Sequence, residues 1–285
     1  MNSSIILLIG NCIVDQIWQL EHFPAQDEEM RALAKTRVMG GNACNSARVL
    51  AMLGDQVELV SSLAQDAWGD WLLQQLSAQG ISTQYCRQLT GFSTPESSIW
   101  LSRANGSRTI VHHRNLPELT LTELRQIPVE NYQWIHLEGR NIETLATYLT
   151  ELGGFNGRIS LEIEKNRAGI ESLLALVDVV IVSSAYLKST GQTAEQCMTV
   201  FQRYNPALDV VCTLGEQGLI ACDSASRMTR IEAEPVDRVV DTIGAGDCFI
   251  AGLIQQMVGQ HDFHSALQVA NRLAAKKIQH EGLVF

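Results

Sequence analysis

The sequence predicts an α/β protein: a doubly wound, mainly parallel sheet flanked by helices, with a small antiparallel β-sheet lid. Three observations predict it. Short apolar, β-branched runs alternate with longer segments of helical periodicity. Two stretches, 12–40 and 92–114, show strand-like alternation without intervening helices. With 285 residues, 46% of them hydrophobic, the chain is long enough to bury a full core.

The core strands are expected where short aliphatic runs are bounded by turn residues. These runs are Ile5–Ile9, Val57–Ser61, Trp134–Leu137, Ile159–Glu162, Val179–Val182, Val210–Thr213 and Gly218–Cys222. Helices are expected between or after them, at Cys44–Leu53, Trp68–Ala78, Ile142–Leu152, Ala168–Leu176, Ala194–Gln202, Asp247–Val258 and Phe263–Gln279. Strands that alternate with helices favour a parallel sheet covered on both faces.

The two stretches without helices are predicted to form the lid. The second contains Asn105-Gly106, a strong signal for a two-residue hairpin turn. The chain shows no internal repeat, low-complexity tract or Pro/Ser-rich linker. We therefore expect a single domain over 1–285, with a lid formed by roughly 12–40 and 92–114.

Composition excludes several classes of function. A formal net charge of −10 opposes binding to nucleic acid or anionic lipid. No apolar run approaches the roughly 20 residues that span a bilayer, and no basic segment precedes the first strand. The seven cysteines lack a CxxC pair and are expected to be reduced thiols. These features predict a cytoplasmic protein.

The most informative segment is Asp241-Thr242-Ile243-Gly244-Ala245-Gly246-Asp247-Cys248-Phe249, which leads into an apolar helix. Small residues at 244–246 let the backbone approach a ligand, and amides at a helix N-terminus bind anions. Asp247 in the first turn would place a carboxylate beside a bound phosphate, where it would accept a proton from a hydroxyl. A glycine-rich turn with Asp247 as a helix cap explains this segment alone equally well.

Two further segments suggest ligand contacts. In Gly40-Gly41-Asn42-Ala43-Cys44-Asn45, the side chains of Asn42 and Asn45 lie one helical turn apart and suit a polyhydroxy ligand. An ordinary Asn-capped helix is the alternative. The turn Thr213-Leu214-Gly215-Glu216-Gln217-Gly218 would pass under a nucleotide, although many β-turns have this composition.

Together these segments resemble the ribokinase-type (PfkB-like) carbohydrate kinase family, which implies a ribokinase-like fold and a single kinase domain over 1–285. The similarity rests on GGNACNSARVLAMLG at 40–54, TLGEQG at 213–218 and DTIGAGDCF at 241–249, in the family's order along nearly the whole chain. The phrases at 106–111, 115–117, 134–141 and 162–165 are most similar to the ketohexokinase-like members. No GxxxxGK[ST] loop and no GxGxxG turn after the first strand is present, which disfavours P-loop kinases and Rossmann dehydrogenases.

The resemblance implies ATP-dependent phosphorylation of a ketohexose such as fructose. A second hypothesis is a kinase of the same family for another sugar, a nucleoside or a phosphosugar. The third is a catalytically silent sugar-binding regulator, which Asp247 disfavours because a pure binder needs no base. No Lys/Arg cluster is evident in the sugar-contacting segments, which favours an unphosphorylated sugar.

The resemblance also implies individual roles. Asp247 would be the general base, with Gly244, Ala245 and Gly246 as the anion hole and Arg108 as a lid residue near phosphate and sugar. The sugar would contact Asp15, Asp27, Gly41, Asn42, Asn45 and Asp247. The ATP site would comprise Arg108, Lys165, Thr213, Gly215, Gly218, Gly244, Gly246 and Asn271. Glu164 would lie near Mg²⁺, and Asp241 with the Ile243 carbonyl would bind a monovalent cation such as K⁺.

The family's assembly suggests a homodimer that clasps through the lid and carries Asp27 of one subunit toward the sugar site of the other. Eight apolar residues were expected to form the clasped face: Ile13, Ile17, Trp18, Leu33, Ile99, Leu101, Ile110 and Val111. One departure from the family pattern stands beside Asp247, where Cys248 and Ile250 replace residues that are usually more polar.

Overall fold

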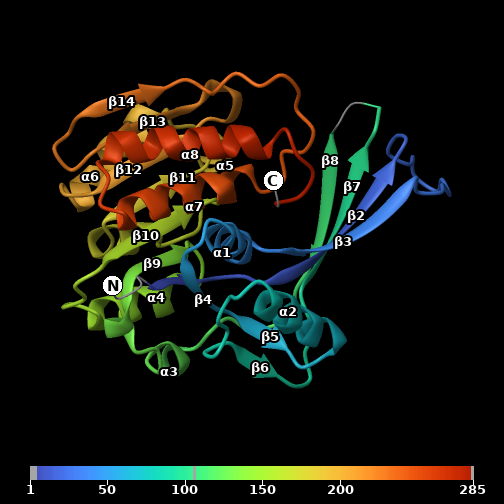
Figure 1. Ribbon diagram of the computed structural model, residues 1–285, viewed down its shortest axis with the longest axis horizontal. Helices are drawn as coiled ribbons and strands as arrows, with labels where there is room; N and C mark the ends of the chain where they lie inside the picture. The colour runs from blue at the N-terminus through green and yellow to red at the C-terminus, as the bar shows by residue number, and fades with distance from the viewer. Residues whose placement is uncertain (1–4, 105–106, 284–285) are drawn as a thin grey trace.

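The computed structural model describes residues 5–104 and 107–283, and its centre is an eight-stranded sheet (Figure 1). The strand order is β14-β13-β12-β11-β10-β9-β1-β4. The bounds are β1 Ile5–Ile9, β4 Gln56–Val60, β9 Tyr132–Glu138, β10 Arg158–Ile163, β11 Val179–Val182, β12 Asp209–Thr213, β13 Leu219–Cys222 and β14 Met228–Ile231. Strands β4 to β12 pair in parallel, and only β13 and β14 at one edge are antiparallel. The predicted doubly wound, mainly parallel sheet is confirmed.

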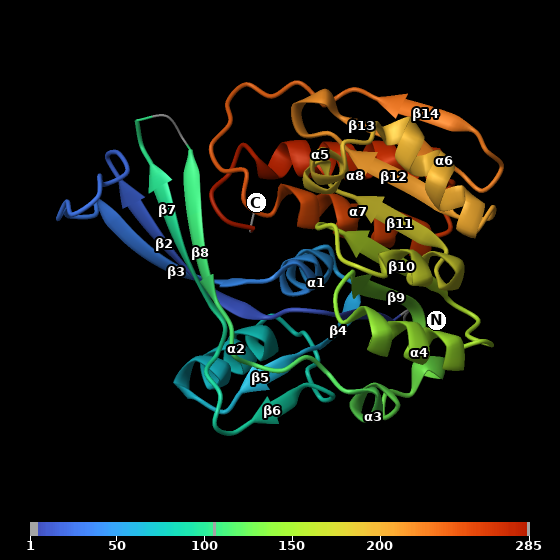
Figure 2. The ribbon, with the colours of Figure 1, turned by 180° about the vertical axis from the view of Figure 1, so that it is seen from behind.

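Helices cover both faces of this sheet, each over its own hydrophobic cluster (Figures 1 and 2). One face carries α1 Asn42–Met52, α2 Ala67–Ala78, α7 Ala245–Val258 and α8 Phe263–Lys277. The other carries α3 Leu121–Leu124, α4 Ile142–Glu151, α5 Ser184–Thr190, α6 Ala194–Tyr204 and the 3₁₀ helix η2 Ile170–Leu176. Two short 3₁₀ turns, η1 Val129–Asn131 and η3 Gly215–Gln217, complete the helical elements of the described residues.

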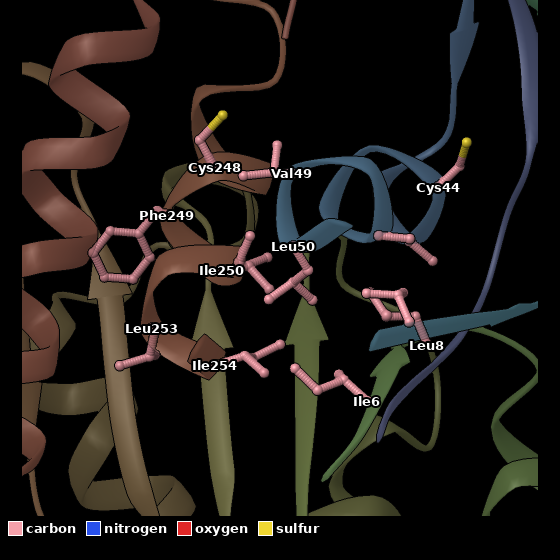
Figure 3. Packing of buried hydrophobic residues seen from close by; sticks show 14 of the residues in the cluster. Ile6, Leu8, Cys44, Val49, Leu50, Cys248, Phe249, Ile250, Leu253 and Ile254 are labelled. Carbon is pink, nitrogen blue, oxygen red and sulfur yellow. The ribbon is translucent and has the colours of Figure 1, made fainter. Parts of the chain in front are cut away.

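The packing of α7 fixes the position of its N-terminus. Ile250 and Ile254 on α7 point toward Leu50 of α1 and Ile6 of β1, and all four side chains are buried (Figure 3). Each fully buried aliphatic side chain contributes roughly 1.5–3 kcal/mol relative to exposure. The apolar Ile250, noted above as a departure from the family pattern, therefore belongs to the core.

A second sheet projects from one side of the core (Figure 1) and corresponds to the predicted lid. Its order is β3-β2-β7-β8, with bounds β2 Ile13–Leu20, β3 Ala34–Gly40, β7 Glu96–Ser102 and β8 Arg108–His113. The two outer pairings are antiparallel, whereas β2 and β7 pair in parallel because the chain passes through the core between them. The predicted Asn105-Gly106 turn lies outside the described residues.

The prediction that the apolar residues of the lid share a single face is wrong in part. Ile17, Ile99 and Ile110 pair side by side and so share one face. Trp18 and Val111 each follow one of these residues directly and therefore lie on the opposite face, because successive side chains of a strand alternate. The lid is apolar on both faces.

A few elements differ from expectation. Residues 170–176 form a 3₁₀ helix where an α-helix was predicted, because the buried positions Ile170, Leu173 and Leu174 suit either period. The short elements α3, α5 and β14, and the small sheet of β5 Ser62–Ala64 with β6 Arg87–Leu89, were not predicted. Their few residues offer too short a pattern to detect.

Candidate active site

A cavity of about 390 Å³ lies where the lid meets the carboxyl ends of β1, β9 and β10. Open parallel sheets bind ligands at this edge. The lid and the segment after it contribute Ile13, Asp15, Ser97, Ile99, Arg108, Ile110, His112 and Arg114. The core contributes Asn11, Gly41, Asn42, Asn45, Glu138, Gly139, Arg140, Glu162, Glu164, Lys165, Arg167, Ile243, Gly244 and Asp247. The structure thus joins the segments around Asn42 and Asp247, which lie far apart in the sequence.

Asp247 is buried in the first turn of α7. Its Oδ2 accepts a hydrogen bond of 2.8 Å from Nδ2 of Asn45. Burial is the main reason that the pKa of Asp247 is raised to about 7; the nearby carboxylates of Glu138 and Glu164 also raise it, and the hydrogen bond from Asn45 lowers it. A carboxylate with such a pKa is suited to accept a proton near neutral pH.

The N-terminus of α7, where the anion site was expected, is open beside Asp247. Gly244 caps the helix with φ of 82°, and a Cβ there would lie 2.4 Å from Cδ2 of Leu283. A Cβ on Gly246 would meet no described atom within 4 Å, and this residue is exposed. Gly244 is therefore required by the backbone, whereas Gly246 leaves space for a ligand at the positive end of the helix dipole.

Arg108 of β8 connects the lid to this site. Its Nη1 donates a hydrogen bond of 3.0 Å to Oγ1 of Thr242, two residues before Gly244. This hydrogen bond places Arg108 next to the loop that leads into α7.

Two buried carboxylates that the sequence analysis did not single out stand at the ends of β9 and β10. Oε1 of Glu138 accepts hydrogen bonds from the backbone N–H groups of Ala43 and Asn11, so it caps α1, whose N-cap Gly41 has no capping side chain. Oε1 of Glu162 accepts from Nδ2 of Asn42, and its Oε2 has no partner among the described residues. Burial raises the pKa of both. In the sequence, the signal for each of these two glutamates was an acidic residue at the end of an apolar run.

Basic side chains from outside the expected sugar-contacting segments also line the cavity. Arg114 forms an ion pair of 3.3 Å with Glu118 and donates to Oδ1 of Asn11 at 2.7 Å. Arg140 forms an ion pair of 2.5 Å with the same glutamate. These two guanidinium groups were missed because only the tertiary structure brings Arg140 to the glutamate that pairs with Arg114.

Lys165 is exposed at the rim of the cavity, as is Arg167, which the sequence analysis did not select. Within residues 5–104 and 107–283, neither forms an ion pair in the salt-bridge geometry. Glu164 lies on the same rim. The rim thus has cationic groups that are not neutralised by an ion pair.

Several predicted residues do not line this cavity among the described residues. Asp27 lies in the exposed loop between β2 and β3 with φ of 61°. Thr213 is the last residue of β12, and in the turn that follows it Gly215 and Gly218 adopt positive φ. Gly215 borders a separate cavity of about 760 Å³ near α5 and α6. Nδ2 of Asn271 donates to the backbone carbonyl of Glu232.

The expected monovalent-cation site at Asp241 and Ile243 does not fit such an ion. Nζ of Lys277 lies 2.7 Å from Oδ2 of Asp241, so the carboxylate already has a cationic partner. Oδ1 of Asp241 accepts from the N–H of Ile243. The positive charge that the structure places beside Asp241 is that of a lysine side chain.

Comparisons with known proteins place these observations in context. Residues 4–285 match the sequence model described as pfkB family carbohydrate kinase. The chain is 30% identical to ketohexokinase of Mus musculus, over 99% of this chain and 98% of the relative. It is 26% identical to ribokinase of Bacillus subtilis (strain 168), over 96% and 92%.

Solved structures with the same fold include ribokinases. The Arabidopsis thaliana ribokinase complexed with ribose and ATP superposes with a TM-score of 0.83 at 22% identity, covering 99% of this chain and 95% of that one. The ribokinase of Giardia lamblia gives a TM-score of 0.87 at 18% identity, covering 99% and 96%. The ribokinase-like fold class is therefore confirmed.

Proposed function

The chain belongs to the pfkB family of carbohydrate kinases and is a sugar kinase, and on that premise we propose that it phosphorylates a ketohexose such as fructose with ATP. The observation that carries the reaction is Asp247, buried beside the open N-terminus of α7 with a pKa of about 7. The ketohexose assignment draws support from the identity with the mouse ketohexokinase over nearly the full length of both chains.

In the proposed reaction, Asp247 accepts the proton of the sugar hydroxyl as its oxygen attacks the γ-phosphorus. The bond between that phosphorus and the β,γ-bridging oxygen breaks, and ADP leaves without a phosphoenzyme. The α7 amides at Gly244, Ala245 and Gly246, together with Arg108, would bind the charge on the transferring group. Catalysis then depends on positioning and electrostatics.

The sugar would be held by Asp15, Gly41, Asn42 and Asn45, of which all four line the cavity. The side chain of Asn45 would contact both the sugar and the general base, because its Nδ2 already donates to Asp247. The nucleotide is assigned to Lys165, Thr213, Gly215, Gly218 and Asn271.

Mg²⁺ fits the residues at the end of β10. The buried Oε2 of Glu162 lacks a hydrogen-bond partner among the described residues and belongs to a side chain that lines the cavity. Glu162 and the exposed Glu164 would hold the ion or its waters, since Mg²⁺ is usually bound by one or two carboxylates and substrate phosphates. The bound ion would supply positive charge to the ATP phosphates. The sequence analysis expected only Glu164 near Mg²⁺, and we add Glu162 to this site.

The charges of the cavity favour an unphosphorylated sugar. Arg114 and Arg140 are engaged with Glu118, so they are poorly placed to neutralise an additional phosphate. The cations that remain at the rim, Arg108, Lys165 and Arg167, match the need of ATP itself. A second phosphate on the sugar would lack a free cationic partner.

We expect fructose to give the highest kcat/KM in an ADP-release assay over ketoses, aldoses, nucleosides and sugar phosphates. A site built to hydrogen-bond the hydroxyls of one sugar rejects analogues that leave its polar groups unpaired. The Asp247→Asn protein, purified in the same way, controls for contaminating kinases. Faster turnover of ribose, a nucleoside or fructose 6-phosphate would contradict the ketohexose assignment.

The lid supports a homodimer. Ile110 and Val111 are 52% and 59% exposed on its edge strand, and lie on opposite faces. Exposed apolar edge strands pair or aggregate unless another surface covers them. Ile110 faces the cavity, so a second copy that clasps the lid across a two-fold axis would bury Val111 on the opposite face.

In such a dimer, the β2–β3 loop would bring Asp27 toward the partner's sugar site. We expect Asp27→Ala to raise KM for the sugar more than KM for ATP, while Glu29→Ala in the same exposed loop changes neither. Light scattering at micromolar concentration measures the assembly alongside the kinetics. A fully active monomer would refute the clasp.

A further inference from the structure

Lys277, the last residue of α8, is completely buried. Its Nζ donates to Oδ2 of Asp241 at 2.7 Å, to the Asp241 carbonyl at 2.8 Å and to the His280 carbonyl at 3.2 Å. A lysine ammonium has three N–H donors, and here each has an oxygen acceptor. A buried charge is tolerated only when it is paired and hydrogen-bonded in this way.

These acceptors resemble the oxygen ligands of a metal cation. One carboxylate and two backbone carbonyls surround the ammonium, and hard cations take the same types of ligand in proteins. Asp241 is also the residue for which a monovalent cation was expected. The ammonium therefore stands where that ion would have to bind, and it uses the same carboxylate.

The contacts of Lys277 tie the C-terminal segment to the loop that leads into α7. Asp241 receives hydrogen bonds from the N–H groups of Ile243 at 2.8 Å and Gly282 at 3.1 Å. The carbonyl of Ile278 accepts from the N–H groups of Val240 and Asp241. This arrangement ends one residue before Gly244, the N-cap of α7, so the position of the anion site depends on it.

We propose that Lys277 is a built-in positioning residue whose ammonium replaces a monovalent cation, so that the enzyme orders its phosphate-binding loop without K⁺. This inference rests on the assignment of the chain as a sugar kinase, and it does not depend on which sugar is the substrate. Lys277 acts through Asp241 and the 241–244 loop and touches no substrate.

The first experiment compares the unaltered enzyme in K⁺ and in tetramethylammonium at equal ionic strength. We expect the same kcat and the same melting temperature in both salts. Strong activation by K⁺ would overturn the proposal. If no sugar is phosphorylated, the substrate assignment fails, but the melting comparison still decides whether K⁺ binds.

The second experiment removes the ammonium with Lys277→Ala. In tetramethylammonium, kcat should fall by about 10²-fold, the loss expected when catalytic groups are misplaced by about 1 Å. K⁺ or NH₄⁺ should restore kcat and raise the melting temperature in a concentration-dependent manner, because an ion that binds only the folded state stabilises it. The neighbouring exposed Lys276→Ala should show neither effect.

Full activity of a folded Lys277→Ala protein in tetramethylammonium would overturn the proposal. So would a loss of activity that no small cation reverses, because a purely structural role predicts that result. If Lys277→Ala does not fold, the comparison of kcat and melting temperature of the unaltered enzyme in K⁺ and in tetramethylammonium decides the proposal, because strong activation by K⁺ overturns it.

Discussion

Asp247→Asn is expected to lower kcat by about 10²–10⁴-fold, the usual contribution of a positioned general base. KM for sugar and ATP should change little, because asparagine preserves the shape of the buried site and still offers an oxygen to Nδ2 of Asn45. Steady-state kinetics with both substrates measure the split between kcat and KM. Asp55→Asn, which removes a carboxyl bonded to Gln255, is the matched control and should leave kcat unchanged.

The pH dependence provides a second readout for the same residue. The base must be ionised, so kcat/KM should rise with pH and level off above the pKa of about 7. Burial raises this pKa from 3.8 to about 7. The protonated carboxyl therefore adds its full contribution to the free energy of unfolding below about pH 3.8, and this contribution is lost as the pH rises through about 7. Asp247→Asn avoids that loss. Urea denaturation should therefore show a stability advantage of the variant that is larger at about pH 8 than at about pH 4.

An Asp247→Asn enzyme with near-normal kcat would show that the carboxylate is not the base. A kcat/KM that does not vary between about pH 5 and pH 8 would contradict the raised pKa as well.

Gly246→Val is expected to lower kcat by about 10²–10³-fold, comparable to the loss of an oxyanion-hole donor. A side chain at this position would project into the space proposed for the transferring phosphate. Since a Cβ on Gly246 meets no described atom within 4 Å, the melting temperature should change little. Kinetic constants and thermal melts of the same preparation measure both quantities.

Gly154→Val is the matched control, because a Cβ there also meets no described atom within 4 Å and the site is remote from the cavity. It should alter neither property. Gly244→Val should lose stability together with activity, because φ is 82° and Leu283 stands 2.4 Å from the added Cβ. A normal kcat in Gly246→Val would contradict the proposed anion site at the N-terminus of α7.

The parts of the candidate site that consist of adjacent residues in the sequence could be predicted. The glycine-rich turn before an apolar helix located Asp247 and the anion site, and the segment after the lid strands located Asn42 and Asn45. Glu138 and Glu162 were not selected, because a single acid at the end of an apolar run is a weak signal. Their positions matter only because adjacent parallel strands end at the same edge.

The sequence by itself determined the α/β class, the projecting lid, most of the elements and the placement of Asp247 at a helix N-terminus, since each depends on local periodicity or turn chemistry. Only the tertiary structure decided the split of the lid's apolar residues between two faces, the raised pKa of Asp247 and the pairing of Lys277 with Asp241. Those properties depend on burial and on distances between groups far apart in the chain. Lys277 and Asp241 are 36 residues apart, so only the packing of α8 beside the 241–244 loop brings the ammonium to the carboxylate.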